Sequence, residues 1–248
     1  MNNAHIFNIL WRDKIKFNPL FGLFLIVGLG IPRFILVLNA TVTGQFHYVS
    51  IVFVVMWILP FVFLSREGRK FIGMRKIKSL KWIFYSFLLG AIASVTVYLL
   101  GDYFYQDTLH NWFVYMAQPF YKDLNETNRL VLFIISAIIG MTFSPIGEEL
   151  LYRGLVHGSF QTNLGEEKSS FIDSAAFGIT HLAHFGIIYV SGKWEFLLIP
   201  SLLWVILMFL TSRLFFICKK RTGSIMGAIV SHAGFNLVMM YIIFYHIL

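Results

Sequence analysis

A succession of long apolar stretches, separated by short polar connections, dominates this sequence. Each helical crossing of lipid hydrocarbon requires about 20 apolar residues, and seven stretches approach that length. They are Pro19–Leu38, Tyr48–Leu64, Trp82–Leu100, Leu130–Ile146, Phe171–Val190, Phe196–Ile217 and the segment that begins at Ser224. We therefore predict an all-α, polytopic transmembrane helix bundle of about seven spans, formed by a single integral-membrane domain over residues 1–248.

The composition excludes a water-soluble globule. Hydrophobic residues make up 58% of the chain and charged residues 13%, whereas soluble domains average about 45–50% and about 25%. The single cysteine, Cys218, excludes an intrachain disulfide and a cysteine-rich metal site. Membrane lipids are thus expected partners, and the compact chain with short loops favours a bacterial plasma membrane.

The distribution of lysine and arginine predicts the orientation. If the N-terminus is cytoplasmic, the outer segments hold only Lys122, Arg129 and Lys193, while fifteen of the twenty basic residues lie in inner segments. Because cytoplasmic loops carry the excess of basic residues, this bias predicts an N-in, C-out topology. The net charge of +8 is then a topology signal, and no nucleic-acid partner is expected. Arg33, inside the first stretch, is interpreted as a snorkelling or internally paired arginine.

An acidic cluster follows the fourth stretch. Ionisable groups within spans are costly and are functional hypotheses by default. If the helix continues to Arg153, then Tyr152 and Arg153 form its interfacial anchor and Gly154 its C-cap. Glu149 would pair with Arg153 at i,i+4, and Glu148, left without a local partner, could act as a general base. Alternatively, both glutamates simply end the helix in cytoplasmic water.

Two histidine clusters follow. His181 lies about ten residues into the fifth stretch, near the bilayer midplane, and His184 shares its helical face at i+3. Asp173 fits a capping box at the start of that helix. In the last stretch, His232 is followed at i+4 by Asn236. A carboxylate, two imidazoles and an amide at similar depths form a constellation typical of a hydrolytic site.

Three spaced motifs carry a resemblance to a known family. Their order and spacing resemble the signature of the CAAX-protease and bacteriocin-processing (CPBP or Abi) family of intramembrane proteases. The motifs are Glu148-Glu149-x-x-x-Arg153, Phe177-x-x-x-His181 and His232-x-x-x-Asn236. Each motif lies on a separate predicted helix, and the family core would span about residues 130–248.

The resemblance implies a role for each motif residue. Glu148 would be the general base for a catalytic water, and His181 would hold that water. His232 and Asn236 would stabilise the oxyanion. The supporting residues are Glu149, Arg153, Phe177 and His184. No metal or other cofactor is favoured, and Zn²⁺ held by Glu148, His181 and His232 is the alternative.

The expected function is an intramembrane endopeptidase that hydrolyses a peptide bond with glutamate-activated water. Its substrate would be a membrane-associated peptide or a lipidated protein. One alternative is lipoprotein N-acylation on the same scaffold, because a site that directs water at a carbonyl can direct an amine instead. Another is a non-enzymatic bacteriocin-immunity membrane protein. The sequence predicts no oligomeric state.

Overall fold

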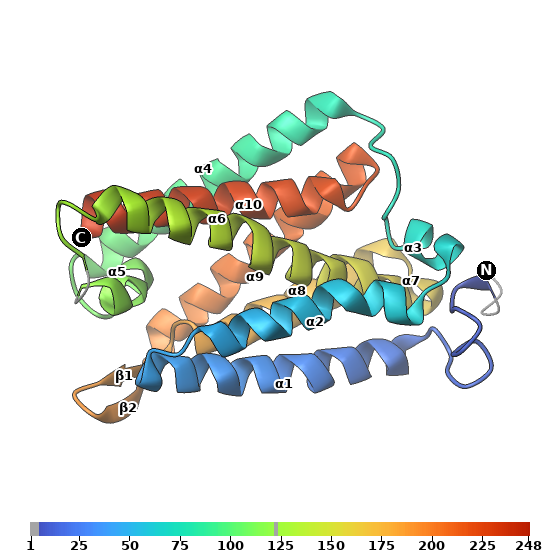
Figure 1. The fold of residues 1–248 in the computed structure, drawn as a ribbon, viewed down its shortest axis with the longest axis horizontal. Coiled ribbons are helices and arrows are strands. Elements are labelled where there is room, and N and C mark those ends of the chain that lie inside the picture. The colour runs from blue at the N-terminus through green and yellow to red at the C-terminus, as the bar shows by residue number, and fades with distance from the viewer. Residues whose placement is uncertain (1–4, 122–123) are drawn as a thin grey trace.

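Long helices make up the computed structural model, which describes residues 5–121 and 124–248 (Figure 1). α1 and α2 lie side by side, α10 runs along α6, and the small β1–β2 hairpin projects from one end of the bundle. The elements are α1 (Pro19–Thr43), α2 (His47–Phe63), α3 (Arg66–Phe71), α4 (Leu80–Tyr105), α5 (Trp112–Ala117), α6 (Arg129–Glu148), α7 (His157–Leu164), α8 (Glu166–Thr180), β1 (Ile187–Val190), β2 (Lys193–Phe196), α9 (Leu198–Thr222) and α10 (Met226–Ile242).

The helix lengths confirm an all-α membrane bundle. In the part of the chain that the structure describes, five helical segments are long and apolar enough to cross a membrane by length and composition. They are Pro19–Thr43, Leu80–Tyr105, Arg129–Leu164, Leu198–Thr222 and Met226–Ile247. The apolar α2 is shorter, at 17 residues. The seven crossings and the N-in orientation stay predictions, and Lys122, one of the predicted outer basic residues, lies outside the described residues.

The predicted span Phe171–Val190 is wrong as one continuous helix. α8 ends at Thr180, a single 3-10 turn follows, and the chain then forms the antiparallel β1–β2 hairpin. The two connecting residues, Ser191 and Gly192, both have positive φ, of 50° and 82°. Such a two-residue turn matches the twist of paired strands. The β-branched and aromatic side chains of Ile187–Val190 therefore belong to a strand, and His181 directly follows the last residue of α8.

The helix that begins at Arg129 does not end at Gly154, as the sequence predicted. It continues through a π-helical segment, Glu149–Val156, and then through α7 to Leu164. Tyr152 and Arg153 are fully buried, so the predicted interfacial anchor and C-cap are wrong. The physical reason is packing, because this segment lies against α1, α2 and α8 instead of reaching the interface. π-helical turns within α-helices occur frequently at functional sites.

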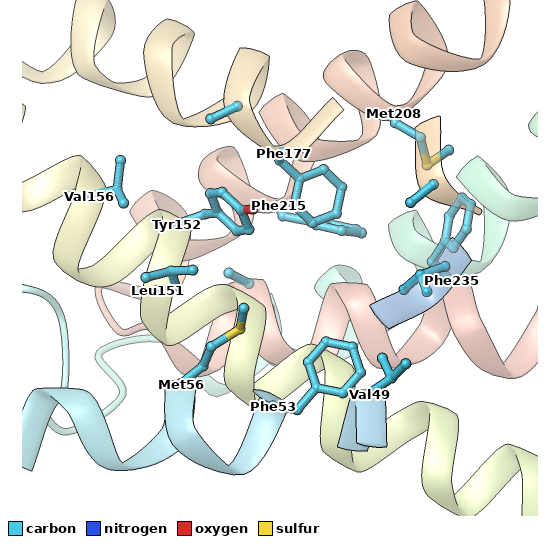
Figure 2. Packing of buried hydrophobic residues seen from close by; sticks show 14 of the residues in the cluster. Val49, Phe53, Met56, Leu151, Tyr152, Val156, Phe177, Met208, Phe215 and Phe235 are labelled. Atoms are coloured by element: carbon cyan, nitrogen blue, oxygen red, sulfur yellow. The ribbon is translucent and has the colours of Figure 1, made fainter. Parts of the chain in front are cut away.

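A cluster of large apolar side chains surrounds this segment (Figure 2). The cluster combines residues of α2, the π-helical segment, α8, α9 and α10, among them Phe53, Met56, Leu151, Tyr152, Phe177, Met208, Phe215 and Phe235. In contrast, the outward faces of α1 and α4 expose apolar side chains such as Phe24, Ile35 and Ile92. Lipid covers such faces in a membrane protein, so the polar groups are concentrated inside the bundle.

α4 and α10 approach closely at two glycines. A Cβ atom added to Gly90 would lie 1.8 Å from the backbone oxygen of Ser231, and one added to Gly234 would lie 2.4 Å from that of Phe87. Small residues at membrane helix interfaces allow this close approach. The two glycines therefore allow α10, which carries His232, to pack directly against the backbone of α4.

Replacing Gly90 by alanine is expected to lower the thermal unfolding midpoint, because overpacking against a backbone atom costs about 1–3 kcal/mol. Gly28 of α1 is the matched control, since the nearest neighbour of its added Cβ is the Phe24 Cζ atom at 4.0 Å. Unfolding of both variants in detergent would be followed by intrinsic fluorescence. Equal midpoints for Gly90→Ala and Gly28→Ala would contradict the close contact.

Candidate active site

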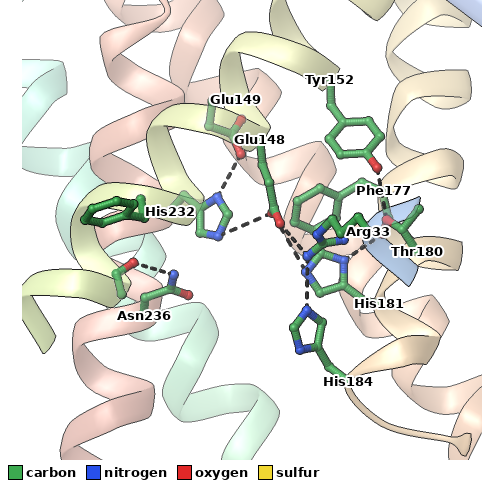
Figure 3. Close-up of polar contacts among 12 residues, drawn as sticks. Arg33, Glu148, Glu149, Tyr152, Phe177, Thr180, His181, His184, His232 and Asn236 are labelled. Atoms are coloured by element: carbon green, nitrogen blue, oxygen red, sulfur yellow. Dashed lines mark hydrogen bonds and ion pairs between the residues drawn. The ribbon is translucent and has the colours of Figure 1, made fainter. Parts of the chain in front are cut away.

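Polar side chains from α1, α6, α10 and the 3-10 turn after α8 meet inside the bundle (Figure 3). Glu148 ends α6, and Glu149 begins the π-helical segment. His181 follows α8 directly, and His232 lies within α10. Arg33 reaches the same place from α1. Glu148 and Glu149 have no exposed surface, which rules out the interpretation that they end the helix in cytoplasmic water.

Glu148 faces both histidines with one carboxylate oxygen. Its Oε2 atom lies 3.9 Å from His181 Nε2 and 3.9 Å from His232 Nε2. These distances are too long for direct hydrogen bonds, and Oε2 makes none within residues 5–121 and 124–248. The motif residues Glu148, His181 and His232, separated in sequence, are thus brought to one point.

The other ring nitrogen of each histidine is already bonded. His181 Nδ1 lies 2.7 Å from the Phe177 carbonyl oxygen. Because a carbonyl only accepts, Nδ1 donates this bond, and a neutral ring carries its lone pair on Nε2. His232 Nδ1 lies 2.9 Å from Glu149 Oε1. Both imidazoles therefore present Nε2 to Glu148.

Aromatic rings fix the planes of these imidazoles. The rings of Phe177 and His181 have centroids 4.1 Å apart. Phe215 stacks on His232 at 4.8 Å with an interplanar angle of 16°. Phe177 thus both accepts the His181 hydrogen bond and packs on its ring, which gives a physical basis for its place in the second motif.

Glu149 and Arg153 form the predicted ion pair. Arg153 Nε lies 3.1 Å from Glu149 Oε2, at helical spacing i,i+4. The Arg153 guanidinium also lies 4.2 Å from the centre of the Phe177 ring and 5.4 Å from that of Phe215. Such a cation–π arrangement is strongest where water is excluded. Arg153 therefore holds Glu149, and through it the ring of His232.

Asp173 continues the buried polar network on the far side of Arg153. Its Oδ1 atom lies 4.0 Å from Arg153 Nε, and its Oδ2 atom lies 2.8 Å from His157 Nδ1. The predicted capping box is wrong, because α8 begins at Glu166 and Asp173 lies two turns inside it. The carboxylate instead pairs with Arg153 of the π-helical segment and His157 of α7, both of which are buried.

Arg33 joins the site although no functional role was predicted for it. Its Nη2 atom forms an ion pair with Glu148 Oε1 and lies 3.1 Å from His184 Nε2. The arginine is internally paired, as one of the two interpretations predicted, and it supplies the partner that Glu148 lacks locally. No sequence spacing links α1 to α6, so the available signal was the cost of an arginine within a span.

Asn236, predicted to act beside His232, contacts the backbone of α6. Its Nδ2 atom donates a 2.8 Å hydrogen bond to the Gly140 carbonyl oxygen, which ties α10 to α6 (Figure 3). Gly140 lies two turns before Glu148 on α6. The structure therefore brings Glu148, His181 and His232 together and directs Asn236 to the helix backbone beside them.

Imidazole nitrogens and a carboxylate oxygen are atom types that bind zinc, but at this site they lie farther apart than zinc ligands do. Tetrahedral ligands at about 2.1 Å from Zn²⁺ lie about 3.4 Å from one another, whereas each Nε2 atom is 3.9 Å from Glu148 Oε2. The Arg33 guanidinium pairs with the same carboxylate. Among the described residues, no group of three His, Cys, Asp or Glu has the arrangement of a metal site.

The site is a buried glutamate between two imidazoles inside a bundle of apolar helices. A sequence model of the family described as type II CAAX prenyl endopeptidase, Rce1-like, matches residues 130–238. The match confirms the predicted resemblance to the CAAX-protease and bacteriocin-processing family over that segment, and it supports an intramembrane endopeptidase. Comparisons with curated proteins and with solved structures gave no match.

Proposed function

We propose that the protein hydrolyses a peptide bond in a membrane-associated peptide or lipidated protein, with Glu148 as the general base for water. The observation that carries this proposal is the position of the Glu148 Oε2 atom, buried and 3.9 Å from both imidazole Nε2 atoms. Polar groups more than 3.5 Å apart can be joined by a water molecule that hydrogen-bonds to both. The match of residues 130–238 to a prenyl endopeptidase family supports the same chemistry.

The proposed attack uses Glu148 and His181. Because His181 Nδ1 is bonded to the Phe177 carbonyl, its Nε2 lone pair accepts one proton of the water in a hydrogen bond. Glu148 Oε2 accepts the other. The water oxygen then attacks the scissile carbonyl carbon while its proton moves to Glu148. When the C–N bond breaks, Glu148 returns this proton to the leaving amine nitrogen.

His232 supplies the proposed oxyanion donor. A doubly protonated ring, with Glu149 as its counter-ion, donates from Nε2 to the carbonyl oxygen as negative charge develops there. Arg153 fixes Glu149 and so preorganises this donor. In this proposal Asn236, predicted as a second oxyanion donor, keeps α10 in register with α6 through Gly140.

The proposal assigns no step to a metal. We expect purified protein to contain far less than one transition-metal ion per chain, because Arg33 already supplies the positive charge beside Glu148. Mass-spectrometric metal analysis, paired with cleavage before and after chelator treatment, checks this. Stoichiometric zinc whose removal stops cleavage would contradict it, and zinc readdition would then serve as the control.

The substrate class is tested by cleavage in a bilayer. The purified chain, reconstituted in bacterial lipids, would be incubated with membrane-anchored peptides in lipidated and unmodified forms. Mass spectrometry is expected to show two fragments whose masses sum to the substrate plus one water. A lipoprotein that gains an acyl mass would support N-acylation instead. If folded protein changes no peptide and no lipoprotein, the enzymatic proposal is wrong.

A further inference from the structure

Arg33 lies outside the matched segment, residues 130–238, yet it contacts the proposed base directly. Its side chain is 1% exposed and that of Glu148 is 0% exposed. The guanidinium lies 5.6 Å from the centre of the Phe53 ring, on α2. α1 itself contacts the π-helical segment, α8 and the 3-10 turn that carries His181. The arginine is therefore held on several sides.

The ion pair makes the two oxygens of Glu148 unequal. Arg33 Nη2 binds Oε1, and Oε2 is the oxygen that faces His181 and His232. A free carboxylate rotates about its last bond and exchanges its oxygens. A buried, charge-assisted contact to one oxygen stops that rotation and leaves the other in a fixed direction.

His184 fixes the guanidinium in turn. Its Nε2 atom lies 3.1 Å from Arg33 Nη2, the same nitrogen that pairs with Glu148. Its backbone N–H donates to the carbonyl oxygen of His181, 3.0 Å away. His184, which contacts Arg33, is thus joined by one turn of backbone to His181, the residue proposed to hold the water.

We propose that Arg33 is the positioning residue of Glu148, that it aims Oε2 at the catalytic water, and that His184 orients Arg33. The proposal rests on the proposed function, because it gives Glu148 the role of base. It adds α1 to the catalytic machinery of the matched segment. An arginine that only neutralises a buried charge would change the amount of folded protein and leave the rate per folded molecule unchanged.

The test uses the full chain with five single substitutions and one pair, and one of the five, Glu148→Gln, serves as the reference. Arg33→Gln removes the charge, and Arg33→Lys keeps the charge but lacks the planar guanidinium group. His184→Ala removes the partner of the guanidinium. Arg213→Gln is the matched control, because Arg213 also lies in a long apolar helix and pairs with a glutamate, Glu167, at 3.0 Å. The pair Arg33→Gln/His184→Ala completes a double-mutant cycle.

Single-turnover cleavage, normalised to folded protein, is the first readout. We expect a loss of about 100-fold for Arg33→Gln, at the lower end of general-base effects. The partial changes should cost less than that range, about 10-fold for Arg33→Lys and about 5-fold for His184→Ala. Arg213→Gln should keep the unmodified rate. Because His184 acts through Arg33, the double variant should lose no more than Arg33→Gln alone.

Infrared difference spectroscopy is the second readout. The spectrum of the unsubstituted chain minus that of Glu148→Gln isolates the Glu148 carboxylate band. This band should shift in Arg33→Gln and in His184→Ala and stay in place in Arg213→Gln. If Arg33→Gln does not fold, Arg33→Lys and His184→Ala give the same test.

Unchanged rates and an unshifted band in the folded variants, together with an inactive Glu148→Gln, would overturn the role of Arg33 and leave the proposed function intact. Cleavage by Glu148→Gln at the unmodified rate would instead overturn the proposed function itself.

Discussion

Replacing Glu148 by glutamine is expected to slow peptide-bond cleavage by about a thousandfold, within the range that a general base contributes. Glutamine has nearly the same shape and fills the same buried position beside His181 and His232. Its amide cannot take the proton of the attacking water. Single-turnover cleavage of a peptide identified in the bilayer assay would measure the loss.

Glu126 provides the matched control for this substitution. It is an exposed glutamate shortly before the first residue of α6, whereas Glu148 is the last residue of that helix. Glu126→Gln should cleave at the unmodified rate. If Glu148→Gln is folded and loses less than about tenfold, Glu148 is not the base.

Replacing Arg153 by methionine is expected to lower the free energy of unfolding by about 3–5 kcal/mol, because removing one partner leaves a buried charge uncompensated. Arg153 is fully buried, pairs with Glu149 and lies against the Phe177 ring. Methionine fills similar volume without charge. Titration of the purified protein with sodium dodecyl sulfate would measure unfolding.

Two further variants separate charge from packing. Arg12→Met removes an exposed arginine that pairs with Asp13, and such pairs contribute about 0–1 kcal/mol. Arg153→Met/Glu149→Gln removes both charges and should recover part of the lost stability. An Arg153→Met protein as stable as Arg12→Met would contradict a structural role for the buried pair.

Local patterns predicted the bundle and the ion pair beside the site, and the family resemblance predicted that three motif residues meet. Apolar stretch length decides which segments are helices in lipid. Helical spacing placed Glu149 opposite Arg153, and the structure shows that pair at 3.1 Å. The resemblance to a known family then indicated that Glu148, His181 and His232 converge, as they do.

The rest depends on tertiary packing, which spacing does not encode. The apolar run Ile187–Val190 is compatible with a helix or a strand. It forms a strand because it pairs with β2. Asp173 fits a cap by residue type, but its buried partners lie on other elements. Arg33 meets Glu148 only because α1 packs against the π-helical segment. In each case a distant contact outweighed the local pattern.

The most direct test of the central claim is single-turnover cleavage in ¹⁸O-labelled water with an added amine nucleophile. If Glu148 activates water for direct attack, every newly formed carboxylate should carry one ¹⁸O atom and no peptide–amine adduct should form. A peptide–amine adduct, or a new carboxylate without ¹⁸O, would show that the carbonyl reacts with another nucleophile and would contradict the mechanism.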